Sequence, residues 1–406
     1  MNNKACLYVI LFTTFLDWMS IGLVYPMFTT MVFAAEGVLL AEGAGDTARA
    51  LVLGLLLSAT SITEFFVAPV LGALSDRRGR RKVLLVSLFC GVVGYGLCVL
   101  SVFVASIWLL IVARLVVGVA SSNAGVAAAT IADISTTEDR ARHFTLYSMM
   151  CGVGFAVGPF FGGMLSQWGY SVPFLFTLVL TVLNMIFVFW VLPETNPVGG
   201  IHSSDEAFGF ANIKKALFYP RLRAVFISSF FVIVGWSLYW EFMPVHQIRY
   251  HGFSSQQVGN MFAYGGAFFV FSSAFLTRYV IARFGEMKSF EYAMLHLALA
   301  ISAVYFFSEA LLLWWIIPLQ QFWLALFYPT STTLVSRMAA PSAQGEVLGI
   351  HTSIQSFAFV VAPILGGLML SVDSHILVIA AVAMVLIGAL FFRREVRRSE
   401  TQDPVP

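Results

Sequence analysis

Charge is scarce in this chain of 406 residues. Lys, Arg, Asp and Glu supply 11% of the residues, whereas 59% are hydrophobic. Soluble domains contain about 25% charged residues, so this chain has too little charge to cover a water-facing surface. The composition excludes a soluble globular protein and predicts solvation mainly by lipid. A formal net charge of +2 gives no reason to expect nucleic acid as a partner.

Cysteines and catalytic motifs are also few. The four cysteines lie in apolar runs without metal-ligand spacing, so we expect buried free thiols and no metal site. The sequence contains no Walker A phosphate loop, zinc-ligand pattern or serine-nucleophile elbow. We therefore expect no enzymatic activity, no ATP hydrolysis and no cofactor. An ion gradient is then the expected driving force.

Long apolar runs fill most of the chain. A membrane-spanning helix needs about 20 predominantly apolar residues, which predicts an all-α integral membrane protein with twelve transmembrane helices. The runs lie at 5–32, 49–74, 83–104, 106–130, 143–168, 172–192, 223–248, 258–281, 289–308, 311–335, 346–370 and 375–393.

A long polar stretch after the sixth run divides the chain into halves. We predict two six-helix bundles with a cytoplasmic linker and a cytoplasmic tail; the ranges are 1–195, 196–220, 221–395 and 396–406. The halves repeat one another, since "GPFFGG" at Gly158 matches "APILGG" at Ala362, and Gly79 falls nearly opposite Gly285. Parallel six-helix repeats are typical of one class of secondary transporter.

Lys and Arg indicate the orientation. With the N-terminus inside, 20 of the 23 Lys and Arg residues fall in cytoplasmic segments. Arg49 and Arg249 fall outside, and Arg114 falls within the membrane. Because cytoplasmic loops are enriched in positive charge, both termini are predicted to be cytoplasmic.

The stretch "GALSDRRGRRKVL" at Gly72 holds the densest charge. Gly72 allows close approach of a neighbouring helix, and Asp76 can accept hydrogen bonds from a helix N-terminus, which the repeat places near Gly345. We predict a conformational latch that ties the halves together; the basic residues also serve as a topology anchor. The latch residues are Gly72, Asp76, Arg77, Gly79, Arg80 and Arg81.

A second glycine-rich stretch, "GVGFAVGPFFGGML", lies in the run at 143–168. Gly154, Gly158 and Gly162 recur every four residues and share one helix face, which permits tight, sliding helix contact. Pro159 adds a kink, and Gly163 completes the motif. Ordinary small-residue packing is the alternative interpretation.

These motifs resemble the major facilitator superfamily. "GALSDRRGRRKVL" resembles the family signature, "RLVVGVASSNAG" resembles its second motif, and the glycine-rich stretch resembles the motif of proton-coupled drug exporters. The resemblance is to the tetracycline-efflux-like branch and implies a bacterial inner-membrane antiporter. That branch typically carries a histidine and further acids in its third, eighth and ninth spans. Here the run at 83–104 has no acid, the run at 258–281 has no histidine, and the run at 289–308 has His296 and Glu291. The resemblance therefore implies proton-coupled export but does not extend to tetracycline as the substrate.

Four ionisable residues within the apolar runs are proton-coupling candidates, because a charge at mid-bilayer costs about 2.5–3.5 kcal/mol. They are Asp17, Glu64, Arg114 and Glu241. We expect Asp17 and Arg114 to pair, either as a structural salt bridge or as a proton-sensitive site tuned by Arg114. Glu64 has no evident partner and is expected either to titrate during transport or to be structural.

Aromatic and amide side chains are substrate-site candidates. Trp236, Tyr239 and Trp240 share a helix face and serve either as interfacial anchors or as an aromatic wall for a flat or cationic substrate, with Glu241 as counter-charge. Amides would be unpaired in lipid, so Asn123, Gln320, Gln321 and Gln355 are expected to face a central cavity. We expect His296 and His351 to be packing residues.

The leading functional hypothesis is a proton-coupled antiporter that exports small amphipathic molecules by alternating access. Its expected partners are a small-molecule substrate, protons and the lipid bilayer, and a monomer is expected. The alternative is a proton-coupled transporter of a specific metabolite or siderophore. A non-transporting receptor or scaffold fits less well, because it has no use for a sliding glycine face or a buried arginine.

Overall fold

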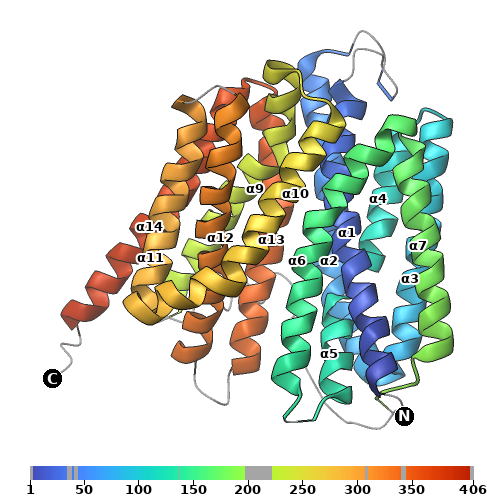
Figure 1. Ribbon diagram of the computed structural model, residues 1–406, viewed down its shortest axis with the longest axis horizontal. Helices are drawn as coiled ribbons and strands as arrows, with labels where there is room; N and C mark the ends of the chain where they lie inside the picture. Colours follow the sequence, from blue (N-terminus) through green and yellow to red (C-terminus); the bar gives the residue numbers. More distant parts are fainter. Residues whose placement is uncertain are drawn as a thin grey trace. The chain divides into compact units, whose positions relative to one another are not determined.

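The computed structural model describes residues 3–33, 39–40, 44–136, 138–196, 222–306, 310–339 and 344–402. Within these ranges the regular structure is helical and no residue is in a strand (Figure 1). The predicted linker at 196–220 lies outside the described residues apart from Asn196, and α14 extends to Gln402, into the predicted tail.

The helices follow the predicted runs closely. The first half contains α1 (Asn3–Phe33), α2 (Asp46–Arg78), α3 (Arg80–Phe103), α4 (Ile107–Ser121), α5 (Ala124–Ile134), α6 (Arg140–Leu165), the short η1 (Ser166–Trp168) and α7 (Ser171–Val191). The second half contains α9 (Arg223–His251), α10 (Ser255–Phe271), the π-helical η2 (Ser272–Leu276), α11 (Thr277–Phe306), α12 (Ala310–Met338), α13 (Gln344–Leu370) and α14 (Ser374–Gln402).

Eleven stretches of the described chain are long and apolar enough to cross a membrane. One of them, Ser255–Tyr305, has 51 residues and would be about 76 Å long as a straight helix, more than twice the bilayer core of about 30 Å. Gly285 breaks it with φ 75° and ψ 165°. Counted as two spans, this stretch brings the total to the predicted twelve.

The break at Gly285 has a counterpart in the first half. Gly79 separates α2 from α3 with φ 96° and ψ 146°. Both glycines combine a positive φ, which L side chains rarely adopt, with an extended ψ. Because they occupy equivalent places in the internal repeat, the same backbone turn is built twice in the chain.

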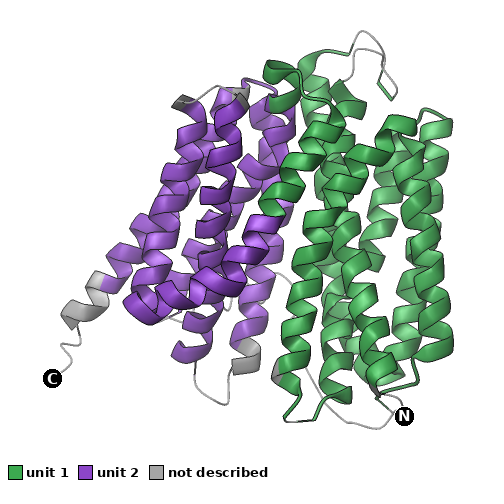
Figure 2. Ribbon diagram, in the orientation of Figure 1, with its two compact units in different colours: residues 1–208, 247–266 green, residues 209–246, 267–406 purple. Residues whose placement is uncertain are grey.

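Contacts divide the chain into two compact units (Figure 2). Unit 1 comprises residues 1–208 and 247–266, and unit 2 comprises residues 209–246 and 267–406. The end of α9 and most of α10 therefore pack with the first-half helices, although they belong to the second half of the sequence. The bundle boundaries predicted from sequence stay a prediction.

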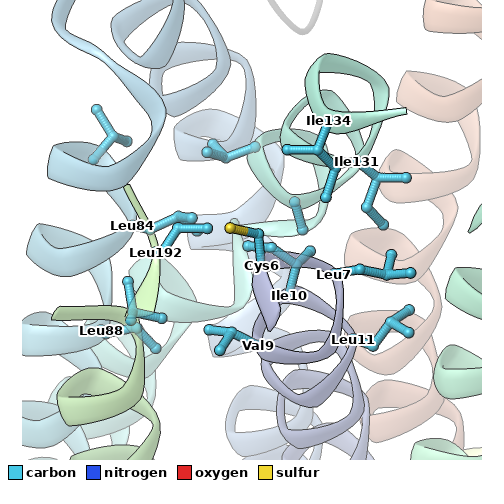
Figure 3. Packing of buried hydrophobic residues seen from close by; sticks show 14 of the residues in the cluster. Cys6, Leu7, Val9, Ile10, Leu11, Leu84, Leu88, Ile131, Ile134 and Leu192 are labelled. Atoms are coloured by element: carbon cyan, nitrogen blue, oxygen red, sulfur yellow. The ribbon is translucent and has the colours of Figure 1, made fainter. Parts of the chain in front are cut away.

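Each unit has an apolar core that positions its helices. In unit 2, Phe290 of α11 packs against Phe327 of α12 and Phe392 of α14, with ring centroids 5.3 and 4.9 Å apart. In unit 1, side chains from α1, α3 and α5 and from the residue that follows α7 enclose the free thiol of Cys6 (Figure 3). Members of this cluster are Leu7, Ile10, Leu84, Leu88, Ile131, Ile134 and Leu192. This cluster fixes the helix ends beside the charged stretch that begins at Gly72.

Candidate functional site

Arg80 is the centre of the charged stretch between α2 and α3. Its side chain forms ion pairs with Asp76 at 2.6 Å and Asp133 at 3.2 Å, and Nη1 donates a hydrogen bond to Ser75 Oγ at 2.5 Å. Its backbone N–H donates to Glu194 Oε1 at 2.7 Å. Arg80 is only 8% exposed, so it joins α2, α3, α5 and the segment after α7 through a buried charge.

Gly79 makes this arrangement possible. Its positive φ is unfavourable for other residues, and an added Cβ would overlap the carboxylate of Glu194. Two further members of the predicted latch lie at the edge of the cluster. Arg81 donates to the carbonyl of Phe189 and lies 5.3 Å from its ring, whereas Arg77 is exposed.

Within unit 1, no helix approaches Gly72 closely, since no described residue of this unit lies within 4 Å of the position that a Cβ would occupy there. A close approach by a helix of the other unit stays a prediction. The carboxylate of Asp76 pairs with Arg80 on the neighbouring helix turn. Its predicted contact near Gly345 would involve the other unit and stays a prediction.

The predicted glycine face of α6 lies against α1. A Cβ at Gly154, Gly158 or Gly162 would overlap a backbone oxygen of α1, and these oxygens belong to Phe15, Met19 and Leu23. The helices therefore touch backbone to backbone over two turns. This is the tight contact that the spacing of the glycines predicts.

Another side of α6 contacts α10 within unit 1. A Cβ at Gly163 would overlap the carbonyl of Ser255, and one at Gly259 would lie 2.5 Å from the carbonyl oxygen of Pro159. Gly266 lies in the same way against Ala156. The glycines of α10, in "VGNMFAYGG", are the signal from which this second contact could have been predicted.

Asp17 of α1 and Glu64 of α2 are half-buried and close enough for their charges to interact. In the described part of the chain neither carboxylate forms an ion pair. Tyr147 of α6, which the sequence did not single out, interacts electrostatically with both. The structure thus brings together two acidic residues, Asp17 and Glu64, that we considered separately from the sequence.

The expected ion pair between Asp17 and Arg114 is not formed. Arg114 is 3% exposed, and its guanidinium lies over the ring of Phe28 at 5.3 Å. The polar groups that interact with it electrostatically are Cys98, Tyr95 and Tyr25. The pairing was wrong because spacing along the sequence does not fix how two helices are rotated about their axes, and Asp17 interacts electrostatically with Glu64.

Glu241 lies in a buried aromatic environment in unit 2. It is 5% exposed and accepts a hydrogen bond from Ser237. Trp236 and Trp240 stack at 5.0 Å with an interplanar angle of 19°. Because both tryptophans and Tyr239 are buried, the structure does not support the interpretation as interfacial anchors.

The predicted amides have different surroundings. Asn123 and Gln320 have no exposed surface, so they do not face a cavity. Asn123 accepts a hydrogen bond from Ser87 at the break between α4 and α5, and Gln320 donates to Tyr239 Oη at 3.1 Å and to the carbonyl of Ala300 at 3.0 Å. Gln321 is also buried.

The remaining amide and the two histidines lie in unit 2. Gln355 is half-buried, with its Nε2 3.4 Å from His351 Nε2. His351 is buried, and its Nε2 lies 3.3 Å from Ser229 Oγ. His296 stacks on Trp323 at 4.4 Å. Both histidines thus pack against neighbouring side chains, as expected.

The family model of the Major Facilitator Superfamily matches residues 7–320 and 293–406. The chain belongs to this superfamily. The match covers nearly the whole chain and confirms both the predicted family and the all-α transporter fold.

Within the superfamily, similar proteins include drug-resistance transporters. The chain is 30% identical to the class C tetracycline resistance protein of Escherichia coli over 371 residues, which is 90% of this chain and 89% of the relative. It is 23% identical to multidrug resistance protein 2 of Bacillus subtilis strain 168, over 95% of this chain and 94% of the relative. These relatives agree with the predicted tetracycline-efflux-like branch.

Solved structures show the same fold. A bacterial homologue of the human lysosomal transporter Spinster, in an inward-facing and unoccupied conformation, superimposes with a TM-score of 0.76 at 15% identity and covers 97% of each chain. Membership of the superfamily and eleven described stretches long and apolar enough to cross a membrane identify this chain as an integral membrane transporter. The Arg80 ion-pair cluster, the α1–α6–α10 glycine contacts, the Asp17–Glu64 acid pair and the buried Arg114 are its candidate functional features.

Proposed function

We propose that this superfamily member is a proton-coupled antiporter that exports small amphipathic molecules, in the class suggested by its tetracycline- and multidrug-resistance relatives. The observation that carries the proposal is the proximity of two half-buried carboxyl groups, Asp17 and Glu64, on neighbouring membrane helices. Neither has a basic partner among the described residues.

Two close carboxyl groups do not both ionise readily, because each negative charge disfavours the other. A pair of neighbouring carboxyl groups is therefore suited to carry a single proton between them. A proton moving inward across a membrane potential releases about 2.3 kcal/mol per 100 mV. Release of that proton inside can be coupled to export of the substrate.

The surrounding features suit a transporter that alternates between two conformations. The α6 glycine face gives a close contact with α1, and another side of α6 gives a close contact with α10. The Arg80 ion-pair cluster is a discrete contact that can form or break. We further propose that one chain is the transporting unit and that both termini lie in the cytoplasm. The distribution of Lys and Arg supports this orientation.

The proposal is tested with purified protein in proteoliposomes. An imposed proton gradient should drive accumulation of a substrate from a panel of tetracycline, ethidium, 1-naphthoate, siderophores and amino acids. Asp17→Asn and Glu64→Gln should each abolish accumulation against a gradient and leave the protein folded. Glu138→Gln, which removes an exposed acid between α5 and α6, is the matched control and should transport normally.

Two results would contradict the proposal. One is transport of panel compounds by the wild type at a rate independent of the proton gradient. The other is normal coupled accumulation by the Asp17→Asn and Glu64→Gln double variant. Transport of only one metabolite or siderophore would instead identify a specific carrier.

A further inference from the structure

Arg114 is a buried cationic residue of unit 1 that has no ion-pair partner among the described residues. It is 3% exposed, and its Nε is enclosed without a hydrogen-bond partner. Among the described residues, no ion pair or hydrogen bond engages the rest of its guanidinium. A buried charge needs a partner, and removing or lacking one is strongly destabilising.

Arginine cannot relieve this imbalance by losing its proton, because its side chain stays protonated in proteins. The acids Asp17, Glu64 and Glu241 differ in this respect, since a buried carboxyl group can bind a proton and become neutral. Arg114 therefore needs a negative charge from another source or a conformation in which one reaches it.

Among the described residues, no carboxylate pairs with Arg114, and Asp17 interacts with the neighbouring Tyr95 instead. The ring of Phe28 lies 5.3 Å from the guanidinium carbon, and the nearby Tyr95, Tyr25 and Cys98 are not acids of the carboxyl type. Attraction to an aromatic face compensates only part of the loss of hydration. The unmet requirement is a group that accepts hydrogen bonds and carries negative charge.

The backbone of α4 at Arg114 is held against α2. Thr60 of α2 donates a hydrogen bond to the backbone carbonyl of Arg114 at 3.3 Å. One turn later, a Cβ at Gly118 would lie 2.6 Å from the backbone oxygen of Thr60, so α4 and α2 are in close contact. Arg114 is thus fixed at a point where α2, α4 and the Phe28 side chain of α1 meet.

From these observations we infer that Arg114 binds a planar anionic group of the transported molecule, a carboxylate carried on an aromatic or other flat apolar body. The fork of guanidinium N–H donors matches the two oxygens of a carboxylate, and the aromatic side chains of Phe28, Tyr25 and Tyr95 suit the apolar part. This inference rests on the proposed function, because it names the substrate class of that transporter.

The test compares two probes of nearly equal shape, 1-naphthoate and the uncharged 1-naphthamide, by equilibrium binding to the full-length detergent-solubilised protein. No proton gradient is present, so the result is independent of proton coupling. The wild type should bind 1-naphthoate about 10- to 100-fold more tightly than the amide, the range expected for hydrogen bonds to a charged group.

Arg114→Gln should remove this preference, and Arg114→Lys should retain part of it because the charge remains without the planar fork. Arg278→Gln, which removes an exposed arginine of α11, should leave it unchanged. If Arg114→Gln does not fold, the Lys variant decides: a preference equal to that of the wild type would overturn the inference. A wild type without the preference, or a folded Gln variant that keeps it, would also overturn it.

Discussion

Gly158→Ala is expected to destabilise the contact between α6 and α1. The new methyl group would overlap the backbone oxygen of Met19 and lie 3.0 Å from the nitrogen of Leu23. These are backbone atoms, which cannot rotate away as the end of a side chain can. One helix must therefore move relative to the other.

The magnitude follows from two opposing effects. Alanine gains up to about 1 kcal/mol over glycine in a helix interior, whereas overpacking costs about 1–3 kcal/mol. With backbone atoms of α1 in the way, overpacking should win, leaving a net loss of about 1–2 kcal/mol. This corresponds to about a 5- to 30-fold change in an equilibrium between conformations.

Gly96→Ala is the matched control. Gly96 lies in α3, and a Cβ there would meet no atom within 4 Å, so this variant should keep the gain in helix propensity. We expect thermal unfolding in detergent to show a lower midpoint for Gly158→Ala and an equal or higher midpoint for Gly96→Ala. Transport should slow only in the former. Equal midpoints and equal rates for the two variants would refute the proposed role of this face.

Three further predictions concern charged groups. Arg80→Gln should lower the free energy of unfolding by roughly 1–3 kcal/mol, because it leaves two acids without their partner, and it should reduce turnover more than substrate affinity. The control variant Arg78→Gln, at an exposed position, should change neither property. Identical unfolding curves for Arg80→Gln and wild type would show that the ion-pair cluster is dispensable. Glu241→Gln keeps an oxygen that can accept the hydrogen bond from Ser237, so we expect unchanged thermal stability together with slower ethidium transport. Unaltered transport would show that the carboxyl group of Glu241 has no role in transport. Hydrogen bonds from the backbone and side chain of His375 hold the pKa of Asp373 below its usual value, so its stabilising effect should be full above about pH 4 and disappear as the pH falls further. Unfolding midpoints of wild type and Asp373→Asn should therefore converge as the pH falls, and a difference that stays constant down to the most acidic pH at which both variants fold would contradict this.

The sequence predicted the membrane helices well because the length of an apolar run is a local property. It also indicated that Gly79 and Gly285 are equivalent, and both have the same unusual backbone conformation. The α6 glycine face was predictable for a similar reason, since spacing of four residues fixes which side chains share a helix face.

Contacts between helices were less predictable. The rotation of each helix about its axis decides that Asp17 lies near Glu64 while Arg114 lies on the ring of Phe28, and spacing along the chain does not encode it. The buried amides show a second limit. Asn123 and Gln320 are satisfied in part by hydrogen bonds inside the protein, so a polar residue in an apolar run does not by itself indicate a cavity.

Proton movement driven by substrate tests the central claim most directly. Proteoliposomes are loaded with a transported panel compound, with no imposed pH gradient, and the internal pH is recorded as the compound leaves. We expect wild-type protein to acidify the interior as the substrate leaves, and the Asp17→Asn and Glu64→Gln variants not to do so. Substrate efflux through the wild type without any proton uptake would contradict it.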